Sequence, residues 1–173
     1  MTNTESFRRI PALSFEPVDD AVLDGSLEDG IAALKRGTVG TLELTEATLS
    51  RIESRESELN AFITLTADDA RTRARSADRQ TALAGVPIGL KDLFDVAGVA
   101  TTAGSKLFAA NMPAADSAVA ARLFAAGAVN LGKTNLHEWA FGVTTNNPHF
   151  GPTRNPWAPD RIPGGSSGGN GAA

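Results

Sequence analysis

The sequence predicts a layered α/β domain, and three observations support this fold class. Segments with apolar residues at helical spacing alternate with short apolar runs that are typical of strands. The composition is ordinary for a globular protein, with 42% hydrophobic and 21% charged residues. A chain of 173 residues is also long enough to bury one sizeable core.

The N-terminal part begins with a predicted irregular leader over residues 1–25. A first helix is expected from Ser26, because Ser26 and Asp29 have the spacing of a capping box, and Gly37 is expected to end it. A second helix is predicted over 42–58, where leucine and isoleucine recur on one face.

Five further elements follow in this order: a strand at 61–65, an exposed helix at 67–80, a strand at 86–90, a helix at 117–126 and a strand at 128–131. The charges of the third helix are expected to form a solvated face. Gly127 is expected to end the fourth helix. The chain from Asn170 onward predicts the beginning of another helix.

The composition excludes several classes of function. The net charge of −4 contains no long run of one sign, which argues against binding to nucleic acid or to an anionic membrane. The absence of cysteine excludes disulfides, thiolate catalysis and cysteine-bound zinc. No apolar run reaches the roughly 18 residues of a membrane span, and no secretory signal is visible, so we expect a cytoplasmic protein.

Two motifs match known sites by their letters only. The segment Gly127–Thr134 fits the phosphate-binding pattern G-x4-G-K-[ST], but a helix precedes it and its centre is strand-like, so a nucleotide-binding module is a minor alternative. His137-Glu138 begins like a zinc motif but has Phe141 where the second ligand should stand. With His149 as the only other histidine, we predict no metal site and structural roles for both histidines.

Lys91 follows the apolar strand at 86–90, and such a lysine can act as a general base only when its amine is neutral. Burial lowers a lysine pKa, by up to roughly 3–5 units in a fully buried site. Asp92 is not expected to pair with it, because consecutive side chains of a strand point to opposite faces. A lysine that extends into solvent at a strand end is the alternative interpretation.

Five of the eight residues from 164 to 171 are glycine, which indicates unusual dihedral angles or a close approach to a ligand. Ser166 and Ser167 lie inside this turn, just before the predicted C-terminal helix. Such a turn can present amide N–H groups and hydroxyls to a substrate carbonyl. A flexible linker is the alternative, although prolines and a tryptophan crowd its approach.

Four blocks of the sequence, in this order, resemble the amidase-signature family: Gly85-Val-Pro-Ile-Gly-Leu-Lys-Asp92, Gly132-Lys-Thr-Asn-Leu-His-Glu-Trp-Ala-Phe-Gly142, Phe150-Gly-Pro-Thr-Arg-Asn-Pro-Trp157 and Pro163-Gly-Gly-Ser-Ser-Gly-Gly169. The resemblance implies an α/β/α sandwich around a mixed sheet, present only in part. It also implies that residues 26–173 are the N-terminal part of a single domain.

The resemblance also implies roles for single residues. Lys91 matches the family's catalytic lysine, and Ser166 matches its bridging serine, whose peptide bond from Gly165 is expected to be cis. Ser167 matches a neighbouring serine that orients the network. Ala140 and Thr144 mark the segment expected to form a wall of the acyl pocket.

The family's nucleophilic serine is expected roughly two dozen residues after Ser166, beyond residue 173, where a second glycine-rich turn also supplies the oxyanion hole. Ser105 lies in a different block and is rejected as a substitute. We therefore predict an amidase that hydrolyses a carboxylic amide of a small molecule without metal or organic cofactor, and a 173-residue chain that is inactive alone. A homodimer is one expected assembly. The alternative is the A subunit of a tRNA-dependent amidotransferase, which releases ammonia from glutamine for partner subunits.

Overall fold

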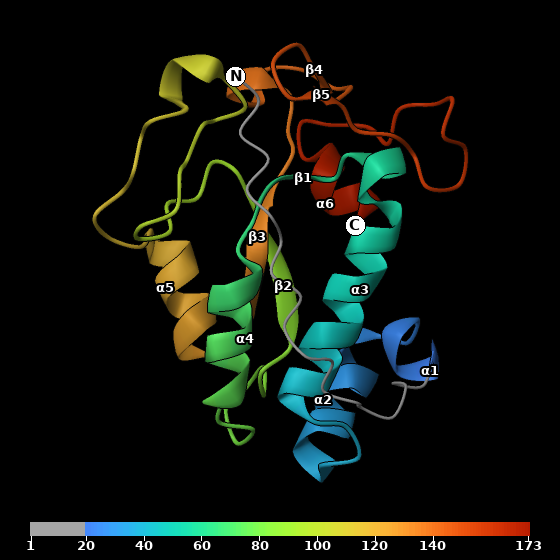
Figure 1. Cartoon of the computed structure of the whole chain (residues 1–173), viewed down its shortest axis with the longest axis vertical. Helices are drawn as coiled ribbons and strands as arrows, with labels where there is room; N and C mark the ends of the chain where they lie inside the picture. Colours follow the sequence, from blue (N-terminus) through green and yellow to red (C-terminus); the bar gives the residue numbers. More distant parts are fainter. Residues whose placement is uncertain (1–19) are drawn as a thin grey trace, which may run out of the picture.

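The computed structural model describes residues 20–173, so residues 1–19 of the predicted leader lie outside the described part (Figure 1). Where the description begins, Asp20–Leu23 form the short helix α1. The prediction of irregular structure up to residue 25 is therefore wrong for these four residues.

The next two helices confirm the predicted pattern. Helix α2 spans Leu27–Arg36, and its capping box joins Ser26 and Asp29, with the Ser26 hydroxyl accepting from the Asp29 amide at 3.1 Å. Gly37 ends α2 in the left-handed conformation that favours glycine. Helix α3 spans Thr41–Leu59.

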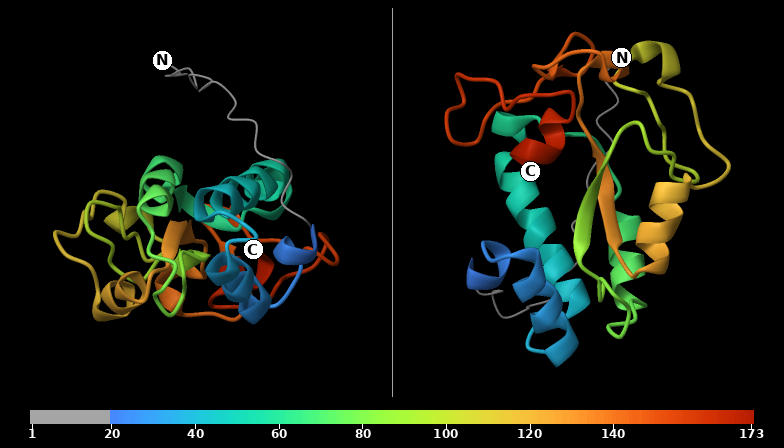
Figure 2. Two further views of the ribbon diagram at one scale, coloured as in Figure 1. Left: turned by 90° about the horizontal axis from the view of Figure 1, so that it is seen from below. Right: turned by 180° about the vertical axis from the view of Figure 1, so that it is seen from behind.

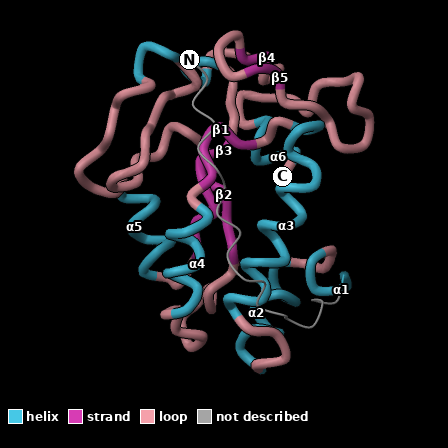
Figure 3. Tube along the Cα trace, in the orientation of Figure 1, coloured by secondary structure: helices cyan, strands magenta, loops and turns pink. Residues whose placement is uncertain are grey.

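A mixed three-stranded sheet lies at the centre of the chain (Figure 3). Its strands are β1 (Phe62–Leu65), β2 (Pro87–Lys91) and β3 (Val129–Thr134), in the order β1-β3-β2. Strand β3 pairs antiparallel with β1 and parallel with β2. The parallel pair brings the carboxyl ends of β2 and β3 to the same edge, where Lys91 lies opposite Thr134.

Helices cover both faces of this sheet, as Figure 2 shows. Helices α3 and α4 (Ala67–Arg75) cover one face, and their buried leucines and alanines pack with Val129 and Leu131. Helix α5 (Ala118–Ala125) covers the other face, where Ala120 packs with Leu90. The predicted layered α/β fold is confirmed.

Two further predicted boundaries differ from the structure by three or more residues. The helix expected over 67–80 ends at Arg75, because the Asp78 carboxylate accepts from the Gln80 amide and turns the chain toward β2. Only its outer face is solvated, since Ala70 and Ala74 are buried in the core. The strand expected over 128–131 continues to Thr134, which places polar residues inside the sheet.

The loops that follow the sheet contain short elements only: the 3-10 helices η1 (Lys106–Phe108) and η2 (Glu138–Ala140), the paired strands β4 (Asn146–Asn147) and β5 (Gly151–Pro152), and helix α6 (Gly168–Ala172). Helix α6 begins two residues before the predicted start at Asn170. None of the helices in residues 20–173 has the length and apolar character of a membrane span.

Candidate active site

The structure brings Lys91 and Ser166 together, although 75 positions separate them in the sequence. Strand β2 delivers Lys91 at its carboxyl end, and Ser166 precedes α6. The Lys91 Nζ and Ser166 Oγ atoms lie 2.6 Å apart, and both side chains are half-buried. A proton can pass directly between an amine and a hydroxyl at this distance.

Burial lowers the pKa of the Lys91 amine below its ordinary value. No carboxylate of the described residues forms an ion pair with Lys91 to counteract this effect. Asp92, the nearest acid in the sequence, has its side chain on the other side of the strand, in contact with Lys133. The environment of Lys91 therefore favours the uncharged amine more than water does.

Thr145 fixes the turn that carries Ser166. Its hydroxyl donates to the Gly164 carbonyl at 2.8 Å and accepts from the Gly168 amide at 2.9 Å. A Cβ at Gly165 would lie 2.9 Å from the Thr145 hydroxyl oxygen, so the turn can approach this closely only with glycine. The Gly165–Ser166 peptide bond is cis, and the Ser166 carbonyl accepts from the His137 amide at 3.0 Å.

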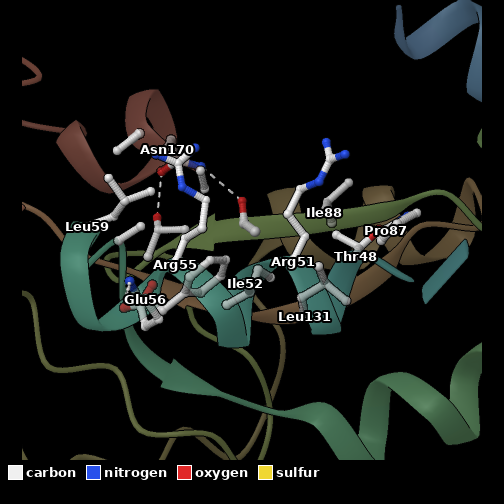
Figure 4. A pocket seen from close by; sticks show the side chains of 16 residues that line it. Thr48, Arg51, Ile52, Arg55, Glu56, Leu59, Pro87, Ile88, Leu131 and Asn170 are labelled. Atoms are coloured by element: carbon white, nitrogen blue, oxygen red, sulfur yellow. Dashed lines mark hydrogen bonds between the residues drawn. The ribbon is translucent and has the colours of Figure 1, made fainter. Parts of the chain in front are cut away.

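Helix α6 is held against the carboxyl ends of β2 and β3. The Gly169 amide donates to the Asn135 carbonyl at 3.0 Å. The Asn170 side chain accepts from the Thr134 hydroxyl at 2.6 Å and donates to the Gly89 carbonyl at 3.0 Å (Figure 4). These contacts place Ser166 over the strand that carries Lys91.

A hollow of about 290 Å³ lies between α3, β2 and α6 (Figure 4). Its wall is mainly apolar, from Ile52, Leu59 and Ile88, with charged groups from α3 at its rim. Neither Lys91 nor Ser166 lines this hollow. The hollow and the contact between Lys91 and Ser166 are therefore separate features of this part of the molecule.

The other predicted site residues surround the turn less closely. Ser167 is exposed and precedes α6, and its hydroxyl makes no hydrogen bond with any described residue. The Thr144 hydroxyl lies 3.2 Å from His137 Nδ1, and the Thr144 amide nitrogen packs against Gly165. Ala140 ends η2 with a φ of 56°, and its amide donates to the His137 carbonyl rather than to the turn.

The structure contradicts the phosphate-binding interpretation of residues 127–134. Gly132, Lys133 and Thr134 belong to β3, with no loop wrapped around a phosphate position and no helix directly after the lysine. The Lys133 side chain is fully buried, and its Nζ lies 2.8 Å from Asp92 Oδ1. An amine in this position is not available to a nucleotide.

The two histidines and Ser105 have structural partners. His149 Nε2 lies 2.8 Å from Glu138 Oε1, and hydrogen bonds of that carboxylate to Ser105 and His149 lower the pKa of Glu138. Ser105 is fully buried, and its hydroxyl caps η1 by accepting from the Leu107 amide. Within the described part of the chain, no three acidic or histidine side chains are grouped so that they could hold a metal ion.

Sequence reasoning missed three groups that build the site: the buried Asp92–Lys133 pair, the Thr145 bridge and the Asn135 anchor of α6. The sequence contains a signal for two of these groups, because Lys133 and Asn135 belong to a run of mostly polar residues at 130–135 that follows the apolar start of a strand. A run of polar residues in a buried strand requires internal partners. The sequence does not reveal which partners these are.

Comparisons with known proteins point to one family. Residues 43–173 match the family model described as Amidase. The chain is 46% identical over 154 residues to the A subunit of glutamyl-tRNA(Gln) amidotransferase from Roseiflexus sp. (strain RS-1), covering 86% of this chain and 32% of that protein. The chain thus spans about a third of the length of the curated relatives that it matches.

Two solved structures also resemble the structure of this chain. The structure of 6-aminohexanoate cyclic dimer hydrolase in complex with substrate matches with a TM-score of 0.83 at 36% identity, over 90% of this chain and 32% of that one. The peptide amidase of Stenotrophomonas maltophilia matches with a TM-score of 0.76 at 35% identity, over 84% of this chain and 33% of that one.

Proposed function

The chain belongs to the amidase family, also called the amidase-signature family, and we propose that it carries the base and the bridging serine of an amide C–N hydrolase. The single observation that carries the proposal is the 2.6 Å contact between Lys91 Nζ and Ser166 Oγ. Burial of an amine without an acidic partner supports its use as a base. The proposed chemistry uses no metal or organic cofactor.

In the proposed reaction, neutral Lys91 takes a proton from the Ser166 hydroxyl, which takes a proton from a second, nucleophilic serine. The nucleophilic oxygen forms a bond to the amide carbonyl carbon. The C–N bond then breaks as the proton returns through Ser166 to the leaving amine. Water cleaves the resulting acyl-enzyme, with the same pair moving the proton.

We propose that residues 26–173 form the first part of a single, longer domain and that the nucleophile belongs to the part that follows. The relatives, which are about three times as long, support this proposal. Ser105 does not suit the role, because its hydroxyl is buried and bonded. Ser167 is proposed to orient the network, and Ala140 and Thr144 to line the acyl side of a small-molecule amide. The cytoplasmic location stays a prediction.

The test uses a family-length protein that carries these residues. Lys91→Met and Ser166→Ala should each lower amide hydrolysis by at least 100-fold, the scale of general-base catalysis, while leaving the melting temperature nearly unchanged. Lys35→Met, which removes an exposed lysine of α2, is the matched control and should keep full activity. Near-normal turnover in either site variant would end the assignment.

The second candidate function is the A subunit of an amidotransferase. The curated relatives of that name are 44–47% identical to the chain, whereas the stand-alone hydrolases compared above are 35–36% identical. Against this, the structure of the Thermotoga maritima subunit matches with a TM-score of only 0.66. Glutamine hydrolysis that depends on added partner subunits would favour the amidotransferase subunit. Cleavage of simple amides by the protein alone would favour the amidase.

A further inference from the structure

A fully buried ion pair lies directly behind Lys91. Asp92 Oδ1 and Lys133 Nζ are 2.8 Å apart, and both side chains are 0% exposed. The Lys133 amine also donates to the Thr101 hydroxyl at 2.8 Å. Asp92 Oδ2 accepts from the amide of Thr102 at 3.0 Å and from its hydroxyl.

Lys133 is the sole cation that balances the Asp92 charge among the described residues. Among the described residues, the Lys133 ammonium is the one group in contact with Asp92 Oδ1, and no other residue donates a hydrogen bond to this oxygen. Both oxygens of the Asp92 carboxylate therefore have a partner only while the Lys133 ammonium is present. A buried charge without a partner is costly and acts strongly on its neighbours.

The pair is tied to the strand end that carries Lys91. Asp92 follows Lys91 in the chain, and its amide donates to the Thr134 carbonyl at 3.1 Å. Lys133 lies on β3 opposite Leu90, one position before the partner of Lys91. Asp92 is therefore the residue that directly follows β2, and Lys133 lies on the adjacent strand next to the residue that pairs with Lys91.

Among the described residues, no other charged group on the neighbouring elements forms an ion pair with Lys91. On α3, Arg51, Arg55 and Glu56 line the hollow beside the first half of β2. Helix α5 carries Arg122, and α6 carries no charged side chain. Burial lowers the pKa of the Lys91 amine.

We propose that Lys133 and Asp92 are positioning residues that keep the end of β2 electrically neutral, so that the buried Lys91 amine can lose its proton. The role as a base rests on the proposed function, whereas the neutral surroundings follow from the geometry alone. An unpaired Asp92 carboxylate would stabilise the Lys91 ammonium, and an unpaired Lys133 ammonium would destabilise it. The two charges thus act on Lys91 in opposite directions.

The experiment is an NMR titration of the lysine side chains of this chain, labelled with ¹³C at the ε position. The sequence has four lysines, so the resonances separate easily, and exposed Lys35 and Lys106 serve as internal controls. Lys133→Met should raise the titration midpoint of Lys91 by on the order of one pH unit, and Asp92→Asn should lower it by a similar amount. The double variant should return the midpoint close to that of the unchanged chain.

This pattern separates electrostatic neutralisation from a purely structural role. A structural role predicts that both single variants move Lys91 in the same direction, toward the midpoint of the exposed controls. That result, or no movement in either variant, would overturn the proposal. A Lys91 that titrates with Lys35 in the unchanged chain would also overturn it.

The experiment has one control for a failure to fold and another for a failure of the proposed function. Asp92→Asn keeps the shape of the side chain and an oxygen for the Thr102 amide, so it tests the proposal even where Lys133→Met does not fold. The titration requires no turnover, so its outcome does not depend on the proposed amidase activity. Conversely, full activity of Lys91→Met in the family-length protein would end the proposed function and leave the ion-pair result intact.

Discussion

Replacement of Gly169 by alanine tests how closely the serine-bearing turn must sit on the sheet. A Cβ at this position would lie 2.5 Å from both the amide nitrogen and the carbonyl oxygen of Asn135, and closer still to the Ala61 carbonyl oxygen. All three neighbours are backbone atoms, which cannot rotate away as a side chain can. The helix itself must therefore move.

The size of the effect follows from these distances. Ordinary contact begins at 3.4 Å, so a Cβ placed 2.5 Å from Asn135 requires a displacement of 3.4 − 2.5 = 0.9 Å. Overpacking of a rigid site costs about 3 kcal/mol, and replacement of a helical glycine by alanine returns about 1 kcal/mol. The net loss of about 2 kcal/mol lowers the melting temperature of a 173-residue chain by about 4–8 °C.

The same displacement acts on Ser166, three residues earlier. A shift of about 1 Å in a reacting group lowers the rate by about 100-fold, which an ammonia-release assay in a family-length protein would detect. Gly171→Ala is the matched control in the same helix, because its Cβ would meet the nearest atom, the Pro163 carbonyl oxygen, at 4.0 Å. Equal melting temperatures and equal rates for both alanine variants would show that α6 tolerates the added methyl group and that close contact with the sheet is not required.

Three further predictions concern Lys91, Lys133 and the activity of the 173-residue chain. Burial lowers the Lys91 pKa, and only the neutral amine can take the Ser166 proton. We therefore expect kcat/KM to be low at pH values below this lowered pKa and to rise as the pH increases through it. A pH profile without this rise would contradict the role of Lys91. Lys133→Met should lower the free energy of unfolding by about 3–5 kcal/mol in urea, since it leaves Asp92 unpaired, whereas Lys35→Met should change it by less than about 0.5 kcal/mol. The 173-residue chain alone should cleave no amide, and measurable turnover would disprove the proposal of a nucleophile outside it.

Local rules predicted the elements whose ends are determined by neighbouring residues. Ser26, Asp29 and Gly37 define α2, and the glycine after α5 ends that helix as expected. These signals act over three or four residues, so the sequence contains them in full. The end of α4 depends instead on an Asx turn at Asp78, for which a charged, alanine-rich segment gives no clear signal.

The resemblance named residues of the candidate site, but it did not name the groups that support them. The resemblance pointed to Lys91 and Ser166, and the structure brings them within 2.6 Å. The Thr145 bridge and the Asn135 anchor depend on pairings 19 to 34 residues apart, from Thr145 to Gly164 and from Asn135 to Gly169. Pairings of this range follow from the topology of the chain, which periodicity does not reveal.

The G-K-T segment that imitates a phosphate loop has a different physical explanation in β3. Leu131 and Thr134 both line the same hollow, although an unbroken strand would place residues three apart on opposite faces. The register between β2 and β3 shifts by one residue between Ile88 and Gly89, which reverses the alternation at that point. Gly132 is required beside the shift, because its φ is 155° and a Cβ there would meet the Thr64 carbonyl.

This irregularity determines which neighbours the last two residues of β3 contact. After the shift, Thr134 faces α6 and bonds Asn170, while Lys133 faces away and meets Asp92. Without it, Lys133 would share the face of Leu131, and the Asp92 carboxylate would be buried beside Lys91 with no cation. The bulge therefore places Lys91 and Lys133 on opposite sides of a single pair of strands, so that Lys133 contacts Asp92 while Lys91 contacts Ser166.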